Sequence, residues 1–234
     1  MGEINTILIT GASKGLGKYL VEYYLGKDIS VIGCSRNRSN ISHDKYKHYC
    51  LDITDERLVK NMFRNIRKSI GTVDVLLNNA GVNYAQMPLL IVPLKSAYNT
   101  FNVNVFGTFL MAREAIKLMM KNNFGRIVNF GSMAVHHEVR GEAVYTASKA
   151  AINSLSRVLA KEVFGYGITC NVIAPSAIKT ELIEAIDKIA LENILKLNAV
   201  PVIGEMTDIS RAIDWIISPE SSTITGQIIY MGGV

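Results

Sequence analysis

The stretch TGASKGLG, Thr10 to Gly17, lies between a short apolar segment and a segment of helical length. Its glycines, Gly11, Gly15 and Gly17, allow a tight turn and a close approach of backbone to a ligand. A helix that begins at this turn points its free N–H groups and the positive end of its dipole at the same spot. The stretch therefore predicts a phosphate-binding turn, although its spacing is not the common GxGxxG.

Apolar, often β-branched segments alternate with helix-length segments along the rest of the chain. The predicted strands are Ile4–Thr10, Ile29–Cys34, Tyr46–Leu51, Val73–Asn78, Arg126–Gly131, Ile168–Ala174 and Gln227–Met231. The predicted helices are Gly15–Gly26, Asp55–Ile70, Ala97–Lys121, Val144–Phe164 and Asp208–Ile217. Because the strands are continuously apolar, we expect burial on both faces. This predicts an α/β fold: a Rossmann-like, doubly wound parallel sheet of about seven strands with helices on both faces.

The composition fits one catalytic domain over residues 1–234, with 49% hydrophobic and 19% charged residues. The net charge of +5 favours anionic partners, and a phosphate-bearing cofactor is one. No concentrated basic face appears, so we expect no nucleic-acid partner. No apolar segment reaches membrane-spanning length and no signal peptide is recognisable, so we expect a cytoplasmic protein without a membrane partner.

The three cysteines, Cys34, Cys50 and Cys170, form no CxxC pair and are odd in number. Cys34 and Cys170 lie in apolar, strand-like segments, where a cysteine behaves as a small buried hydrophobic residue. We therefore expect neither a disulfide framework nor a metal site, and a reducing compartment.

The residues after the second predicted strand, Ser35-Arg36-Asn37-Arg38, indicate a preference for NADP(H). Folds of this kind that bind NAD usually place a carboxylate here, which holds the ribose 2′-hydroxyl. In this chain the next acid is Asp44. An arginine such as Arg36 can hold a 2′-phosphate with two hydrogen bonds, and Lys14 in the glycine turn could reach the same phosphate.

Two further strand ends carry candidate cofactor contacts. Asp52-Ile53 follows the third predicted strand, where the carboxylate could accept a hydrogen bond from the adenine amino group or could cap the helix that begins near Asp55. Asn79-Ala80-Gly81 follows the fourth, where small residues would let a cofactor lie flat. Asparagine side chains can equally shape a turn by bonding nearby backbone.

A serine, a tyrosine and a lysine follow the fifth predicted strand. Ser132 follows the strand end, and Tyr145 and Lys149 are spaced i, i+4, so they share one face of a helix. A free tyrosine titrates near ~10, and a nearby ammonium lowers that value. A tyrosine tuned in this way can exchange a proton with a carbonyl or an alcohol, and Ser132 could hydrogen-bond the same substrate oxygen. These residues predict an oxidoreductase.

Together these motifs resemble those of the short-chain dehydrogenase/reductase family, in its compact single-domain branch, over essentially the whole chain. The family's TGxxxGxG turn corresponds to Thr10–Gly17, its NNAG motif to Asn78–Gly81 and its YxxxK motif to Tyr145–Lys149. Its helix asparagine corresponds to Asn104 and its catalytic serine to Ser132. The pattern is similar to that of 3-oxoacyl-(acyl-carrier-protein) reductases, although Asn123 and Tyr166 stand where those enzymes tend to place arginines for the carrier protein.

The resemblance implies an NADP(H)-dependent enzyme that interconverts a carbonyl and a secondary alcohol by hydride transfer. It implies that Tyr145 is the general acid/base and that Lys149 lowers its pKa and holds the nicotinamide ribose. Ser132 would polarise the carbonyl, and Asn104 would hold a water for proton relay. The cofactor residues expected from the motifs and the resemblance are Gly11, Ser13, Lys14, Gly15, Leu16, Gly17, Ser35, Arg36, Asp52, Ile53, Asn79, Ala80, Gly81, Tyr145, Lys149, Pro175, Ile178 and Thr180. Family members pair through two long helices, so a homodimer or homotetramer is expected.

Some segments depart from the family's pattern. Pro175-Ser176 replaces the usual Pro-Gly beside the nicotinamide amide, and Val202–Asp208 replaces the usual R-x-G-x-P-E-D. We expect residues 177–205 to form a substrate lid, because Ala177–Leu197 is helical in pattern and apolar along one side. Simple helix packing is the alternative. The adjacent pair His136-His137 follows Ser132 closely enough to touch a substrate.

The substrate is left open between a 3-oxoacyl thioester, a sugar and another small ketone. Two other classes of protein share parts of the pattern. A non-catalytic, dinucleotide-sensing regulator would keep the glycine turn and lose the catalytic residues, whereas all four are present here. A sugar-nucleotide epimerase or dehydratase needs a larger C-terminal substrate domain than this chain supplies.

Overall fold

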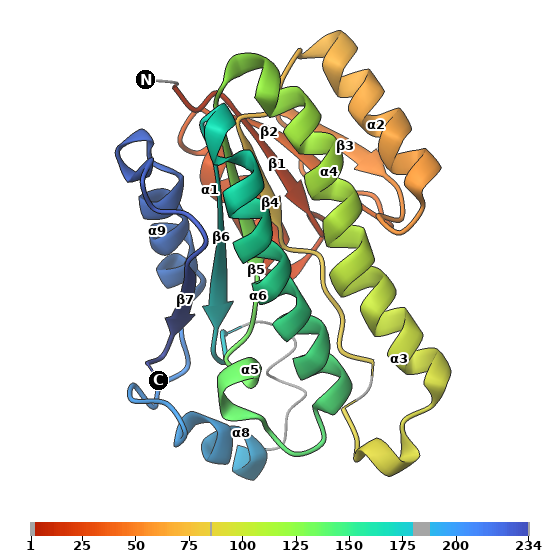
Figure 1. Cartoon of the computed structure of the whole chain (residues 1–234), viewed down its shortest axis with the longest axis vertical. Coiled ribbons are helices and arrows are strands. Elements are labelled where there is room, and N and C mark those ends of the chain that lie inside the picture. Colours follow the sequence, from red (N-terminus) through yellow and green to blue (C-terminus); the bar gives the residue numbers. More distant parts are fainter. Residues whose placement is uncertain (1–2, 85, 180–187, 234) are drawn as a thin grey trace.

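The computed structural model describes residues 3–84, 86–179 and 188–233 (Figure 1). Its centre is a parallel sheet with the strand order β3-β2-β1-β4-β5-β6-β7. The strands are β1 (Thr6–Thr10), β2 (Ser30–Ser35), β3 (Tyr46–Cys50), β4 (Val75–Asn78), β5 (Gly125–Phe130), β6 (Ile168–Pro175) and β7 (Ile228–Met231). The strand order reverses between β1 and β4, which is the switch point where such sheets bind ligands. The predicted fold class is confirmed.

The main helices form a layer on each side of the sheet (Figure 1). One layer holds α2 (Glu56–Ser69), α4 (Thr108–Met119) and α6 (Ala143–Val163), and the other holds α1 (Gly15–Leu25) and α9 (Met206–Ile217). Shorter helices are α3 (Leu94–Phe101), α5 (Ala134–His137) and α8 (Lys188–Leu195), of which α5 and α8 lie beyond the carboxyl ends of the strands.

The core explains why the strands are continuously apolar. Successive residues of a strand point to opposite faces of the sheet. In β1, Leu8 packs into the core beneath α2, α4 and α6, whereas Ile7 and Ile9 pack into the core beneath α1 and α9. All three side chains are buried. Both faces of such a central strand therefore need apolar residues. The edge strand β3 differs from the expected apolar pattern, since it contains Lys47 and His48 and has no buried residue.

The predicted helix Ala97–Lys121 is wrong in its continuity. The structure has α3, then a π-helical turn over Asn102–Gly107, then α4. Such turns insert an extra residue into a helix and occur frequently at functional sites. Gly107 permits a close approach here, since a Cβ on it would lie 2.7 Å from Ile53 Cδ1. The turn carries Asn104, one of the predicted catalytic residues.

At Gly17, the backbone of α1 packs directly against the backbone of the glycine turn. A Cβ on Gly17 would lie 2.2 Å from the carbonyl oxygen of Gly11, which is backbone and cannot rotate away. We expect Gly17→Ala to cost about 1–3 kcal/mol of unfolding free energy, as overpacking does, and to abolish dinucleotide binding. Gly165→Ala is the control, because a Cβ there meets nothing within 4 Å. Equal thermal unfolding midpoints of the two variants would contradict this account.

Candidate active site

The glycine turn lies at the switch point and is tied to the end of β4. Gly11 and Gly15 have φ values of +70° and +54°, in the left-handed region that favours glycine. The Asn79 side-chain amide donates to the Thr10 carbonyl oxygen at 2.9 Å, and the Ala80 N–H donates to Thr10 Oγ1 at 2.9 Å. Two predicted cofactor residues, Asn79 and Ala80, therefore border the turn directly.

The first turn of α1 has no side-chain cap. Lys14 precedes the helix and makes no capping hydrogen bond, whereas Asp55 caps α2 by accepting from the Leu58 N–H at 3.0 Å. The N–H groups at the start of α1 therefore point outward without a side-chain acceptor, beside the positive end of the helix dipole. This arrangement suits a pyrophosphate.

The predicted 2′-phosphate residues surround the carboxyl end of β2. Ser35 ends the strand, and Arg36 and Lys14 are exposed. Within the described part of the chain, neither cation takes part in an ion pair. Both are therefore free to bind a phosphate.

His48 hydrogen-bonds the backbone of the loop that carries Arg36, a role that the sequence did not indicate. Its Nε2 lies 3.0 Å from the Asn37 carbonyl oxygen, and its Nδ1 lies 2.9 Å from the Tyr46 hydroxyl. A carbonyl can only accept, so the ring hydrogen is on Nε2 and Tyr46 donates to Nδ1. Ser35 Oγ donates to the same carbonyl at 2.7 Å. The loop that carries Arg36 is thus held from two sides.

Asp52 does not cap α2. Its Oδ1 accepts from the Thr54 N–H at 2.9 Å and from the Thr54 hydroxyl at 2.8 Å. The carboxylate thus closes a local turn two residues ahead, and Asp55 lies at the position from which a side chain reaches the helix N-terminus. The capping alternative for Asp52 is therefore wrong. Ile53 is buried against Gly107.

Ser132, Tyr145 and Lys149 come together at the carboxyl end of β5. Tyr145 is half-buried in the first turn of α6, and the Ser132 side chain lies close enough to its hydroxyl to lower the pKa of Tyr145. Lys149 is buried one turn later, with Nζ 5.7 Å from the centroid of the Tyr145 ring. Lys149 Nζ donates to the Phe130 carbonyl oxygen at 2.7 Å.

The protonation of this group differs from expectation. Burial raises the pKa of Tyr145 to about 12; the Ser132 side chain lowers it and the Glu142 carboxylate raises it. Burial also lowers the pKa of Lys149 to about 8. The expected lowering of the Tyr145 pKa by Lys149 is not seen, because the ammonium is directed at the Phe130 carbonyl and burial dominates for both groups.

The buried Lys149 leads us to expect a pH-dependent stability. Between pH 8 and 10.5 this lysine is neutral in the folded chain and still charged in the unfolded chain. Folding then releases a proton, so the unfolding free energy rises with pH through this window, by up to roughly 3 kcal/mol. Lys149→Met should lose that rise, as measured by chemical denaturation across the window. Parallel pH curves for the two proteins would refute the expectation.

Asn104 is anchored by its own side chain. Its Oδ1 accepts from the Val82 N–H at 2.8 Å, and its Nδ2 donates to the Val82 carbonyl at 2.9 Å and to Ser148 Oγ at 3.0 Å. A Cβ on Gly81 would lie 3.4 Å from both Asn104 Oδ1 and Lys149 Nζ. Both atoms therefore border the space that a side chain at Gly81 would fill.

The strand end after β6 combines a predicted and an unpredicted feature. Pro175, Ser176 and Ile178 line a cavity of about 260 Å³. Asn198, which the sequence did not single out, is buried beside it and bonds both Ser176 and His137. Thr180 lies outside the described residues, as do residues 180–187 of the predicted lid.

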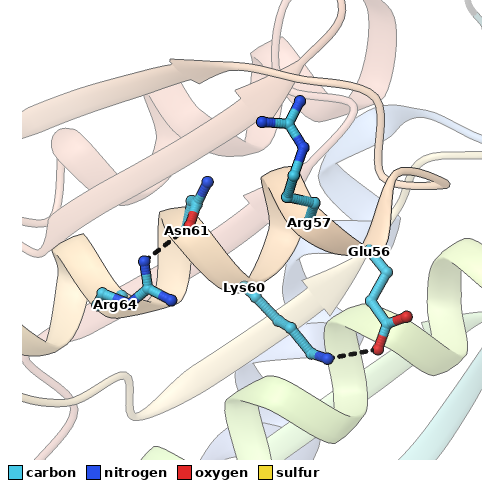
Figure 2. A pocket seen from close by; sticks show the side chains of 5 residues that line it. All are labelled: Glu56, Arg57, Lys60, Asn61 and Arg64. Carbon is cyan, nitrogen blue, oxygen red and sulfur yellow. Dashed lines mark hydrogen bonds and ion pairs between the residues drawn. The ribbon is translucent and has the colours of Figure 1, made fainter.

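A second hollow lies on the outer face of α2, away from these residues (Figure 2). It is lined by Glu56, Arg57, Lys60, Asn61 and Arg64. Glu56 pairs with Lys60 at 2.7 Å and Arg64 donates to Asn61 at 2.9 Å, so the side chains largely satisfy one another. This is the pattern of a solvated helix face.

In the described ranges, no group of three or more His, Cys, Asp or Glu side chains gathers as a metal site would require. Within the same ranges, no helix is both long and apolar enough to cross a bilayer.

Comparison with known proteins gives consistent relatives. Residues 5–190 match the family model described as short chain dehydrogenase. A 3-oxoacyl-(acyl-carrier-protein) reductase from Haemophilus influenzae is 30% identical, over 97% of this chain and 96% of the relative. Among solved structures, ElxO with NADP bound has a TM-score of 0.89 at 29% identity, covering 97% of each chain. A 4-hydroxyisoleucine dehydrogenase complexed with NADH has a TM-score of 0.87 at 28% identity, covering 98% of this chain and 97% of that one.

Proposed function

The chain belongs to the short-chain dehydrogenase family, and we propose that it is an NADPH-dependent reductase that converts a carbonyl to a secondary alcohol. The observation that carries this proposal is the grouping of Ser132, Tyr145 and Lys149 at the end of β5, with buried Lys149 one helical turn from Tyr145 and its Nζ 5.7 Å from the centroid of the Tyr145 ring. This group lies at the carboxyl ends of the parallel strands, where doubly wound folds bind ligands.

The roles follow from the protonation states. A bound nicotinamide dinucleotide supplies the hydride. Because the pKa of Tyr145 is about 12, its hydroxyl is protonated at neutral pH and can donate to a carbonyl oxygen. Ser132 hydrogen-bonds the same oxygen and holds it beside Tyr145. Lys149, with a pKa of about 8, is largely charged at neutral pH and stabilises the phenolate that forms. Asn104 serves as the anchor of a proton path to Lys149.

The cofactor residues are proposed as the sequence predicted them. The outward N–H groups of α1 suit the pyrophosphate, and Asn79–Gly81 borders the turn on the side of β4. The free cations Lys14 and Arg36 favour a 2′-phosphate, hence NADP(H) over NAD(H). Relatives of similar identity carry either NADP or NADH, so this preference rests on the chain's own residues.

A 3-oxoacyl thioester is the first substrate to consider, because the Haemophilus influenzae relative is named as a 3-oxoacyl-(acyl-carrier-protein) reductase. Asn123 is not a cation, and Tyr166 is an exposed aromatic residue. An acyl carrier would therefore need other contacts than the arginines that those reductases tend to use. A keto-sugar or a small ketone is the alternative.

One experiment tests the proposed function. Purified protein is given NADPH with acetoacetyl-coenzyme A, a keto-sugar or a small cyclic ketone, and the loss of NADPH absorbance is followed. We expect turnover with at least one carbonyl, and slower turnover with NADH at low cofactor concentration. If NADPH binds but no carbonyl of any class is reduced, the dinucleotide-sensing alternative is favoured.

We also propose a homodimer or homotetramer and a cytoplasmic location. Exposed apolar side chains lie along the helices that the family resemblance assigns to subunit contacts, namely Phe109 on α4 and Val158 on α6. Burial of such side chains stabilises association. Residues 177–205 are proposed as the substrate lid.

A further inference from the structure

Ser176, which stands where the family usually has glycine, is part of a hydrogen-bond chain. The Asn198 side-chain amide donates to Ser176 Oγ at 2.8 Å, and His137 Nε2 lies 2.8 Å from Asn198 Oδ1. Asn198 is only 6% exposed, so the amide is held away from water. With the amide nitrogen facing Ser176, its oxygen faces His137, which therefore donates from Nε2.

The chain joins the segments around the carboxyl ends of three strands. His137 ends the short helix α5, which follows Ser132 and β5. Ser176 follows β6, and its N–H donates to the Met231 carbonyl of β7 at 3.1 Å. Gly232 packs flat on the pair, since a Cβ there would lie 3.2 Å from both the Ser176 Cβ and the Asn198 side chain. Asn198 is thus fixed between the segment after β5, which carries Ser132 and His137, and the cavity wall at Ser176.

The direction of the Ser176 hydroxyl follows from its partner. Because Ser176 Oγ accepts from Asn198, its own hydrogen must point elsewhere, and none of the described residues accepts it. Ser176 lines the cavity of about 260 Å³, whose other walls include Ile178, Val202 and Ile209. The carboxylates at its edge, Glu205 and Asp208, already bond each other's backbone N–H groups in the capping box of α9.

We propose that the Ser176 hydroxyl, oriented by Asn198 and His137, donates a hydrogen bond to the carbonyl oxygen of a ligand in this cavity. That ligand group is planar and largely apolar and carries a carbonyl. It is either the carboxamide of a nicotinamide or the substrate. The inference rests on the proposed function. It adds a specificity-determining residue to the segment after β6, which is joined to the segment after β5 where the Met133 N–H donates to the Pro175 carbonyl at 3.0 Å.

Asn198→Asp is the sharpest test because it is nearly isosteric and reverses the polarity. An ionised carboxylate can only accept, so it would take the Ser176 hydrogen and remove it from the ligand. Ser176→Ala removes the donor outright and remains informative if the carboxylate introduced by Asn198→Asp destabilises the fold. Asn193→Asp is the matched control, as Asn193 is exposed on α8 in the same segment.

Binding of NADPH and of 2′,5′-ADP, which lacks the nicotinamide, is measured by fluorescence and calorimetry, with NADH and ADP in parallel. If the oxygen is the carboxamide, both variants weaken dinucleotide binding roughly threefold to tenfold and leave the adenosine fragments unchanged. If it belongs to the substrate, only KM for the carbonyl rises by that factor. Unchanged binding and KM in both variants, or equal loss for the adenosine fragments, overturns the assignment. Wild-type protein that binds no dinucleotide overturns the proposed function instead.

Discussion

Tyr145→Phe is expected to lower kcat for carbonyl reduction by roughly 10²- to 10⁴-fold, the usual contribution of a positioned general acid. The phenyl ring keeps the half-buried packing in α6 and loses only the proton that the carbonyl oxygen needs. Dinucleotide binding should weaken by no more than roughly tenfold, the contribution of one lost hydrogen bond, since the glycine turn and the start of α1 are untouched. Steady-state kinetics together with NADPH fluorescence titration measure both quantities.

Tyr166→Phe is the control, because Tyr166 is 41% exposed and lies beyond the end of α6. It makes the same chemical change outside the site and should keep full turnover. A Tyr145→Phe enzyme with wild-type kcat would show that another group supplies the proton. If both variants lose activity equally, the loss does not report proton donation.

The parts of the fold that the sequence predicts are those set by local pattern. Each predicted strand is present, and the central ones form because an apolar, β-branched segment needs cover on both faces, as Ile7, Leu8 and Ile9 show. The edge strand β3, Tyr46–Cys50, has no buried residue. The π-helical turn at Asn102–Gly107 was not predicted. Its cause is tertiary: Gly107 meets Ile53 and the Asn104 side chain bonds Val82, contacts that no helical periodicity reveals.

The candidate site also has features that local sequence pattern predicts and features that depend on tertiary packing. Tyr145 and Lys149 are neighbours by helical spacing, so their proximity could be predicted. Their pKa directions could not, because burial and the Phe130 carbonyl depend on packing of distant segments. Asn198 was missed for a related reason. Its partners Ser176 and His137 lie 22 and 61 residues away in the chain, and no motif marks it.

Arg36→Asp is expected to lower the ratio of kcat/KM for NADPH over NADH by roughly 100-fold. Hydrogen bonds to a charged partner each contribute about 1.5–3 kcal/mol, and the new carboxylate would repel a 2′-phosphate while accepting from a 2′-hydroxyl. Arg36 is exposed and takes part in no ion pair in the described part of the chain. The substitution should therefore leave the thermal midpoint nearly unchanged.

Arg211→Asp makes the same change of charge on the exposed surface of α9 and separates a local contact from a change in the overall field. It should alter both cofactors alike, by a factor that shrinks with added salt. His48 and Ser35 both donate hydrogen bonds to the Asn37 carbonyl, so we expect the loop to keep its shape when Arg36 is replaced. A wild-type preference for NADH, or an Arg36→Asp ratio equal to that of Arg211→Asp, would show that Arg36 does not select the cofactor.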